Sequence, residues 1–272
     1  MSAPLELIKN WTAIQTLAPK QDNALQADSC YPANMQSRTN SLFLIVLAII
    51  ILSPGSIAQD EAAQDAKLEA ALERLNEVIT EEPSRLHHQR AEVLFRLGRF
   101  EESVQDYDAA AKFGWPHNEA SCWERGLAQY YIGDFGGGRE QFERYSRVGP
   151  LDIENGLWQF LCIAEENGVI EARQSMLEYP RRVRKPFPAL LALYLDEGSA
   201  EAVLEEATRD VPASERTANL FNAHYYLGKF YEIVEQDDLA LMHVQESLKH
   251  RIPHFMYACA EADAERLEEK RK

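Results

Sequence analysis

The chain has 272 residues, with 44 acidic and 28 basic side chains and a formal net charge of −16 at pH 7. This acidic balance lacks the positive surface that nucleic-acid binding requires, so we expect no nucleic-acid partner. The four cysteines show no CxxC or Cys/His ligand spacing, and the sequence contains no HExxH motif, phosphate-binding glycine loop or nucleophile elbow. The sequence therefore predicts no metal, no cofactor and no catalytic residue, and an uncharacterised enzyme is the weakest alternative.

The N-terminal part contains an unbroken apolar run, Leu42–Leu52, of 11 residues. A basic residue precedes this run, and a Ser-Pro-Gly break and small residues follow it, which predicts a signal peptide over 35–58 with Gln59 as the mature N-terminus. Residues 1–34 are then interpreted as a mis-called extension before the true initiator Met35. The protein is accordingly expected to be periplasmic or secreted. The alternative is an uncleaved segment that anchors the chain in the inner membrane, although a spanning helix takes about 20 residues.

Residues 59–272 are expected to form one helical domain. Glu61 to Glu82 predicts a single helix, because its leucines recur at helical spacing and Pro83 ends it. We interpret residues 62–83 as a half repeat that begins an array.

Two copies of one pattern follow, at 84–117 and 119–152, in a register of 35 residues. Positions that match carry the same kind of residue. The matching pairs are Ala91/Gly126, Gly98/Gly133, Phe100/Phe135, Ser103/Gly138 and Tyr107/Phe142. Small residues permit close approach of paired helices, and glycine after a helix accepts a left-handed backbone at little cost. The pattern therefore predicts pairs of amphipathic helices that must stack on neighbouring pairs to bury their apolar faces.

The later chain carries weaker copies of this pattern. Three prolines predict a break over 180–188, and acidic residues replace the turn glycine at 235–238. The expected segments are degenerate helices within 153–210 (at 154–166, 169–179, 189–196 and 200–208), a final repeat at about 221–254 and a C-terminal cap helix at 254–270.

A period near 34 with small, glycine and aromatic residues at these places resembles the tetratricopeptide repeat (TPR) family. The order of repeats over about 62–265, with Tyr226-Leu227-Gly228-Lys229-Phe230-Tyr231 in the last one, is similar to the NlpI family of envelope adaptor lipoproteins. The chain departs from that family because no lipobox cysteine follows its apolar run. The resemblance implies an all-α, TPR-type α-α superhelix, a solenoid of antiparallel helix pairs.

For function, the resemblance implies a non-enzymatic, dimeric scaffold that links an envelope protease to cell-wall hydrolases. The protein is then expected to bind peptide or protein partners in a concave groove. An alternative from another class is a structural subunit of an envelope assembly, whose apolar interface is permanently buried. A groove that binds reversibly is expected to carry isolated aromatic side chains among polar ones. A permanent interface is expected to be a continuous apolar surface.

In TPR arrays the first helix of each pair faces inward, and fixed positions on it project into the groove. These positions predict a partner-binding groove formed by His88, Glu92, Phe95, Trp123, Leu127, Tyr130, Tyr131, Tyr225 and Lys229. Trp and Tyr bury a large area and lose little rotamer freedom, so they are favoured in binding hot spots. The alternative is that Trp123 and Tyr130 pack against the first repeat or the middle helices.

Overall fold

The computed structural model describes residues 57–79, 83–116, 118–176 and 184–272. Within these ranges the secondary structure is twelve α-helices and one short 3-10 helix, with no strand, so the all-α prediction is confirmed. The predicted extension and signal peptide lie outside the described residues, except that Ile57 and Ala58 are the first residues of a helix. None of the described helices is long and apolar enough to cross a membrane.

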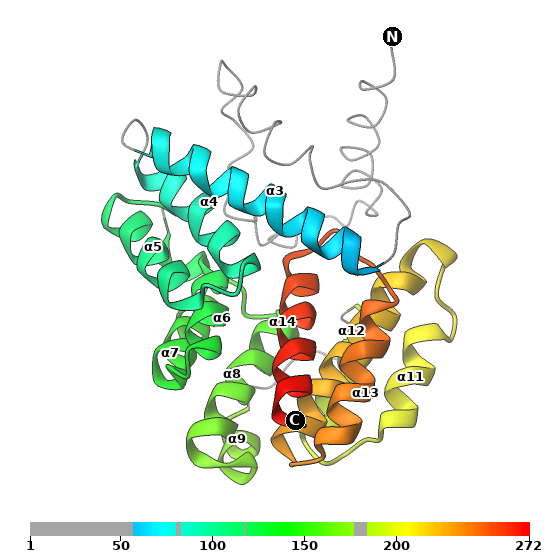
Figure 1. Ribbon diagram of the computed structural model, residues 1–272. Helices are drawn as coiled ribbons and strands as arrows, with labels where there is room; N and C mark the ends of the chain where they lie inside the picture. The colour runs from blue at the N-terminus through cyan, green and yellow to red at the C-terminus, as the bar shows by residue number, and fades with distance from the viewer. Residues whose placement is uncertain (1–56, 80–82, 117, 177–183) are drawn as a thin grey trace. The chain divides into compact units, whose positions relative to one another are not determined.

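Adjacent helices pack as successive pairs along the chain (Figure 1). The elements are α3 (Ile57–Val78), α4 (Pro83–Arg96), α5 (Phe100–Lys112), η1 (Glu119–Ser121), α6 (Trp123–Tyr131), α7 (Phe135–Ser146), α8 (Ile153–Asn167), α9 (Val169–Ser175), α10 (Phe187–Tyr194), α11 (Ala200–Thr208), α12 (Ala213–Ile233), α13 (Asp237–Leu248) and α14 (Phe255–Lys270). Each helix from α3 to α9 contacts the next, and so does each helix from α10 to α14.

Four of the hairpin turns share one backbone arrangement. The second residue after the first helix has a positive φ at Gly98 (69°), Gly133 (76°), Asp196 (67°) and Glu235 (60°). The following N–H then donates to a carbonyl five residues back. These bonds are Arg99 to Leu94 (2.9 Å), Asp134 to Gln129 (2.9 Å), Glu197 to Ala192 (2.8 Å) and Gln236 to Tyr231 (2.8 Å). The arrangement closes the end of each helix by satisfying a carbonyl that has no partner within the helix.

Small residues lie where the paired helices touch, as the repeat pattern predicts. Ser103 Oγ donates a 2.8 Å hydrogen bond to the carbonyl oxygen of Ala91, and both residues are buried. A Cβ atom on Gly138 would lie 3.2 Å from the carbonyl oxygen of Gly126, and one on Gly228 would lie 3.1 Å from that of Ala240. The α4–α5, α6–α7 and α12–α13 pairs are therefore held together by contacts of the same kind.

Several helix boundaries differ from those expected. The helix α9 ends at Ser175 and not at residue 179, because Met176 is already extended. The first helix ends at Val78 and not at Glu82. The helix α10 starts inside the predicted proline break, because Pro188 lies in its first turn, where a missing N–H costs no hydrogen bond. The helix α12 starts eight residues before the repeat was expected, since neither glycine nor proline interrupts residues 213–221.

The main hydrophobic core runs along α8 and takes in the last helix, α14. Leu157 and Leu161 of α8 are completely buried, and the Phe255, Met256 and Cys259 side chains of α14 belong to the same core. The sequence predicts α14 only as a cap on the end of the array. In the structure it packs on α13 and also reaches α4, a helix from the other end of the described chain.

Candidate functional site

The nine residues of the predicted groove lie on α4, α6 and α12, and most of them are buried. The almost completely buried ones are His88, Phe95, Leu127, Tyr130, Tyr225 and Lys229, and the partly buried ones are Glu92, Trp123 and Tyr131. Helix α14, red in Figure 1, lies beside α12 and α13. Its side chains contact several of these residues. The chain's own C-terminal helix thus covers the part of the predicted groove face that is formed by Phe95, Trp123, Tyr131, Tyr225 and Lys229.

The first turn of α14 fills the aromatic part of this face. The ring of Phe255 lies 4.6 Å from that of Phe95 and 5.7 Å from that of Trp123, measured between ring centroids. His254, just before α14, stacks on Trp123 at 6.0 Å. Tyr130 instead meets Trp158 of α8 edge to face at 5.3 Å, so it packs against the middle helices. Sequence reasoning considered that packing for Tyr130, but it missed the contact between Trp123 and α14.

Further along α14, Asp263 receives hydrogen bonds from three of the predicted groove residues. Its carboxylate accepts from the hydroxyls of Tyr131 and Tyr225, each at 3.0 Å, and from the ammonium of Lys229 at 3.1 Å. Asp263 and Lys229 are both fully buried. A buried carboxylate is tolerated when it is paired and hydrogen-bonded, and here one residue of α14 supplies the partner for α6 and α12 together.

Two more charged residues complete what we call the Asp263 network, which comprises Asp263, Lys229, Glu232, Arg266, Tyr131 and Tyr225. Glu232 accepts from Lys229 Nζ at 2.9 Å and from Arg266 through both guanidinium nitrogens, and Arg266 also donates to Asp263 at 2.7 Å. Burial opposes charge on Lys229, but the carboxylates of Asp263 and Glu232 raise its pKa above the ordinary value. Burial also raises the pKa of Glu232, but Lys229 and Arg266 outweigh it and bring the pKa to about 2. The four formal charges sum to zero.

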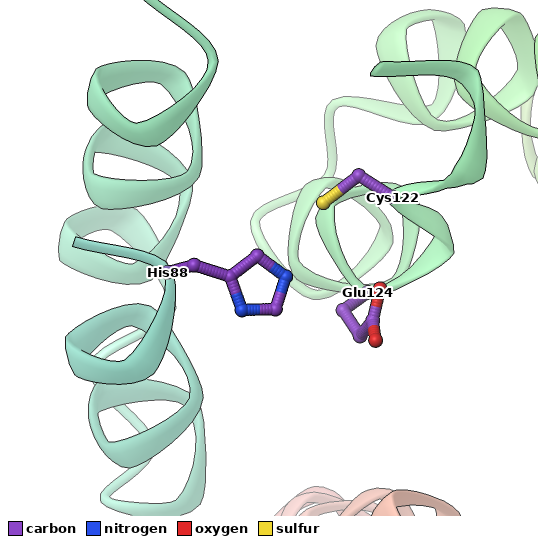
Figure 2. Close-up of side chains that lie close together, drawn as sticks. All are labelled: His88, Cys122 and Glu124. Carbon is purple, nitrogen blue, oxygen red and sulfur yellow. The ribbon is translucent and has the colours of Figure 1, made fainter. Parts of the chain in front are cut away.

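A second group, which we call the α4–α6 polar cluster, consists of His88, Cys122 and Glu124. Figure 2 shows His88 on α4 pointing towards Cys122 and Glu124 at the start of α6. The three side chains are 1%, 4% and 7% exposed, and their potential ligand atoms all lie within 4.8 Å of one another. Neither ring nitrogen of His88 has a hydrogen-bond partner, and neither does Oε2 of Glu124.

Burial dominates the protonation of this cluster. It lowers the pKa of His88 to about 4, so the imidazole is neutral at pH 7. Burial, assisted by the nearby carboxylate of Glu92, raises the pKa of Glu124 to about 8. Each buried polar group without a partner costs about 1–3 kcal/mol. The cluster is therefore a costly arrangement as it stands, in contrast to the Asp263 network.

Sequence reasoning missed this cluster, because its members lie on different hairpins. His88 has a histidine neighbour, but His87 points elsewhere and lies 2.7 Å from the carboxylate of Asp106. Cys122 and Glu124 come about one repeat later in the sequence, at a spacing that fits no metal-binding motif. The stacking of hairpins, which the repeat predicts only in general, is what brings them next to His88.

One other trio of potential ligands occurs within the described ranges, at His224, Glu246 and His250. Two of its members, His224 and Glu246, already have hydrogen-bond partners. The Nδ1 atom of His224 lies 3.0 Å from that of His243, and Glu246 accepts from Lys249 at 2.5 Å. Burial and the neighbouring His243 lower the pKa of His224 to about 4. The members of this trio are only partly buried, unlike those of the α4–α6 polar cluster.

The buried cysteines at 122, 162 and 259 form no disulfide in the structure. Comparison with protein-family models and with curated proteins finds no match to this chain. The resemblance to TPR proteins and to the NlpI family therefore rests on the sequence pattern alone.

Proposed function

We propose that the chain is a TPR-type α-α solenoid that acts as a non-enzymatic scaffold for protein partners in the cell envelope. The observation that carries the proposal is the recurrence of one hairpin design. The turns at Gly98, Gly133 and Glu235 have the same hydrogen bonds, and small residues separate the paired helices at equivalent places. Stacked units of this kind characterise repeat proteins, which use their extended surfaces to bind other proteins.

The face covered by α14 supports a binding role for the first helices. It binds an amphipathic helix through two kinds of contact. Aromatic side chains surround Phe255, and polar side chains donate hydrogen bonds to Asp263. Docking of a helix into a groove through a few anchor side chains is a common mode of peptide recognition. A partner helix with an aromatic residue and an acidic residue two turns later could make the same contacts as Phe255 and Asp263. It would have to displace α14.

The exposed apolar side chains favour this proposal over a permanently buried structural interface. In the part of the chain that the structure describes, the large exposed ones are Phe113, Val148, Leu151, Ile170 and Met242. Ile170 lies on α9 and Met242 on α13, whereas the other three lie between helices, and only one of the five is aromatic. An obligate interface is typically larger and more continuous. The envelope location, the protease and hydrolase partners and the dimer are carried over from the NlpI-family resemblance as parts of the proposal.

Site-specific photo-cross-linking in cells tests this function. A photoreactive residue replaces Arg96, which lies over the ring of Phe255 at the edge of the covered face, or Glu101, which is exposed on α5. We expect protein adducts from position 96 and few from position 101. An adduct with a second copy of the chain would identify the dimer. Equal adducts from both positions, or adducts from position 101 alone, would contradict a binding face on the first helices.

A further inference from the structure

We propose that His88, Cys122 and Glu124 bind a divalent transition-metal ion of the Zn²⁺ class. The ion would join α4 to the start of α6 and so connect the first hairpin to the second. The starting observation is His88, which is 1% exposed, has no hydrogen-bond partner on either nitrogen and points at the other two residues (Figure 2). A bound cation would give this imidazole and Oε2 of Glu124 the partners that the protein does not provide.

The three side chains form a ligand set that suits zinc. One imidazole nitrogen, one thiolate sulfur and one carboxylate oxygen are the donor types that Zn²⁺ takes in proteins, at about 2.0–2.3 Å each. Ligand atoms at the corners of such a tetrahedron lie about 3.5 Å apart. The donors here lie within 4.8 Å of one another, so small side-chain rotations would close the site. One thiolate and one carboxylate would also balance the charge of the ion.

Glu92 defines the role of each nitrogen of His88. Its Oε1 atom lies 3.7 Å from Nδ1 of His88, one turn along α4. Figure 2 shows the other ring nitrogen, Nε2, on the side of Cys122 and Glu124. We therefore assign Nε2 as the ligand. Closing the gap between Nδ1 and Glu92 would let Nδ1–H donate to this carboxylate, an arrangement in which a carboxylate orients a metal-bound histidine. The side chain of Glu92 is 30% exposed, so it also marks the side from which an ion can enter.

This site is independent of the proposed binding function. It adds a structural ion between the first two hairpins, and three protein ligands leave a fourth position for water. A failure of metal binding would leave the scaffold proposal untouched, because the cross-linking experiment does not involve the metal.

Titration of the purified, chelator-treated full chain with Zn²⁺ and with Co²⁺ tests the site. We expect one equivalent of tightly bound Zn²⁺ in competition with a chromophoric chelator. Co²⁺ should give a thiolate-to-cobalt charge-transfer band in the near ultraviolet, since Cys122 supplies the sulfur. The variants C122S and E124Q should each weaken Zn²⁺ binding by tenfold or more, and E92Q should weaken it less. C162S is the matched control, because Cys162 is equally buried but lies outside the cluster.

Several outcomes would overturn the proposal. Equal Zn²⁺ affinity in C122S and C162S would exclude Cys122 as a ligand. Absence of the charge-transfer band in the unaltered chain would do so even if C122S failed to fold. Binding that survives C122S and E124Q but disappears in H224Q would place the ion at the His224 trio instead.

Discussion

The described part of the chain buries two polar clusters, and they differ in how completely their groups are partnered. In the Asp263 network, the carboxylate of Asp263 and the ammonium of Lys229 each have at least two charged or hydrogen-bonding partners, and the charges cancel. In the α4–α6 polar cluster, His88 has no hydrogen-bond partner and Glu124 has an oxygen without one. The first cluster is complete within the protein, whereas the second leaves buried polar atoms without a partner.

This difference shows how burial can serve two purposes. A satisfied polar network in a low-dielectric interior fixes a single arrangement of the elements that supply its members. The Asp263 network thus specifies where α14 sits on α6 and α12. An unsatisfied cluster costs stability unless something binds there. We therefore infer that the Asp263 network holds α14 in place and propose that the α4–α6 polar cluster binds an ion.

The largest effect is expected from removing the centre of the complete network. Asp263→Ala leaves Lys229 buried beside a vacant position, and breaking a buried ion pair from one side costs about 3–5 kcal/mol. Urea unfolding of the full chain measures the change. Asp237→Ala is the control, since it removes an exposed pair with Lys270 that is worth at most about 1 kcal/mol. Equal losses in the two variants would contradict the role given to Asp263.

A somewhat smaller effect is expected from acid. The pKa of Glu232 falls from 4.5 to about 2 in the folded chain, because Lys229 and Arg266 outweigh its burial. A lowered pKa contributes stability that is present above pH 4.5 and is lost as the pH falls through 2, and here that amounts to about 3 kcal/mol. The stability difference between the unaltered chain and Glu232→Gln should therefore shrink over this range. Unfolding curves at a series of pH values would contradict this if the two profiles ran parallel.

The smallest effect has the opposite sign and comes from the incomplete cluster. In metal-free protein, Glu124→Met replaces a buried carboxyl group that has an unpartnered oxygen with an apolar side chain of similar size. We expect a gain of about 1–3 kcal/mol at pH 7. The same kind of exchange in the complete network, Lys229→Met, should destabilise, because it leaves the two buried carboxylates of Asp263 and Glu232 with one cation, Arg266, in place of two. Chemical unfolding in the presence of a chelator compares the two, and destabilisation by both would show that the clusters do not differ.

Local features of the fold could be predicted from the sequence, because they depend on neighbouring residues. The glycines at 98 and 133 and the small residues at 91, 103, 126 and 138 indicated the first two hairpins correctly. Turns that use Asp196 and Glu235 in a left-handed conformation are harder to find, since those residues do not demand it. The boundaries of α10 and α12 were missed because proline is tolerated in a first turn and because a helix continues until something stops it.

The candidate sites depended on contacts between distant parts of the chain, and the sequence predicted them only in part. Five of the predicted groove residues contact α14, namely Phe95, Trp123, Tyr131, Tyr225 and Lys229, but nothing in the repeat pattern indicated this contact. The bond from Tyr131 to Asp263 spans 132 residues. In the same way, His88 lies next to Cys122 and Glu124 only because two hairpins stack.

The thermal midpoint of the full chain, measured first with a chelator and then with Zn²⁺, tests the contrast between the two clusters most directly. An ion that binds only the folded state adds about 2.7 kcal/mol at 100 times its dissociation constant. For a chain of this size that raises the midpoint by roughly 5–10 °C. The account predicts this rise in the unaltered chain and in Asp263→Asn, and no rise in Glu124→Met. No rise in the unaltered chain, or an equal rise in Glu124→Met, would contradict it.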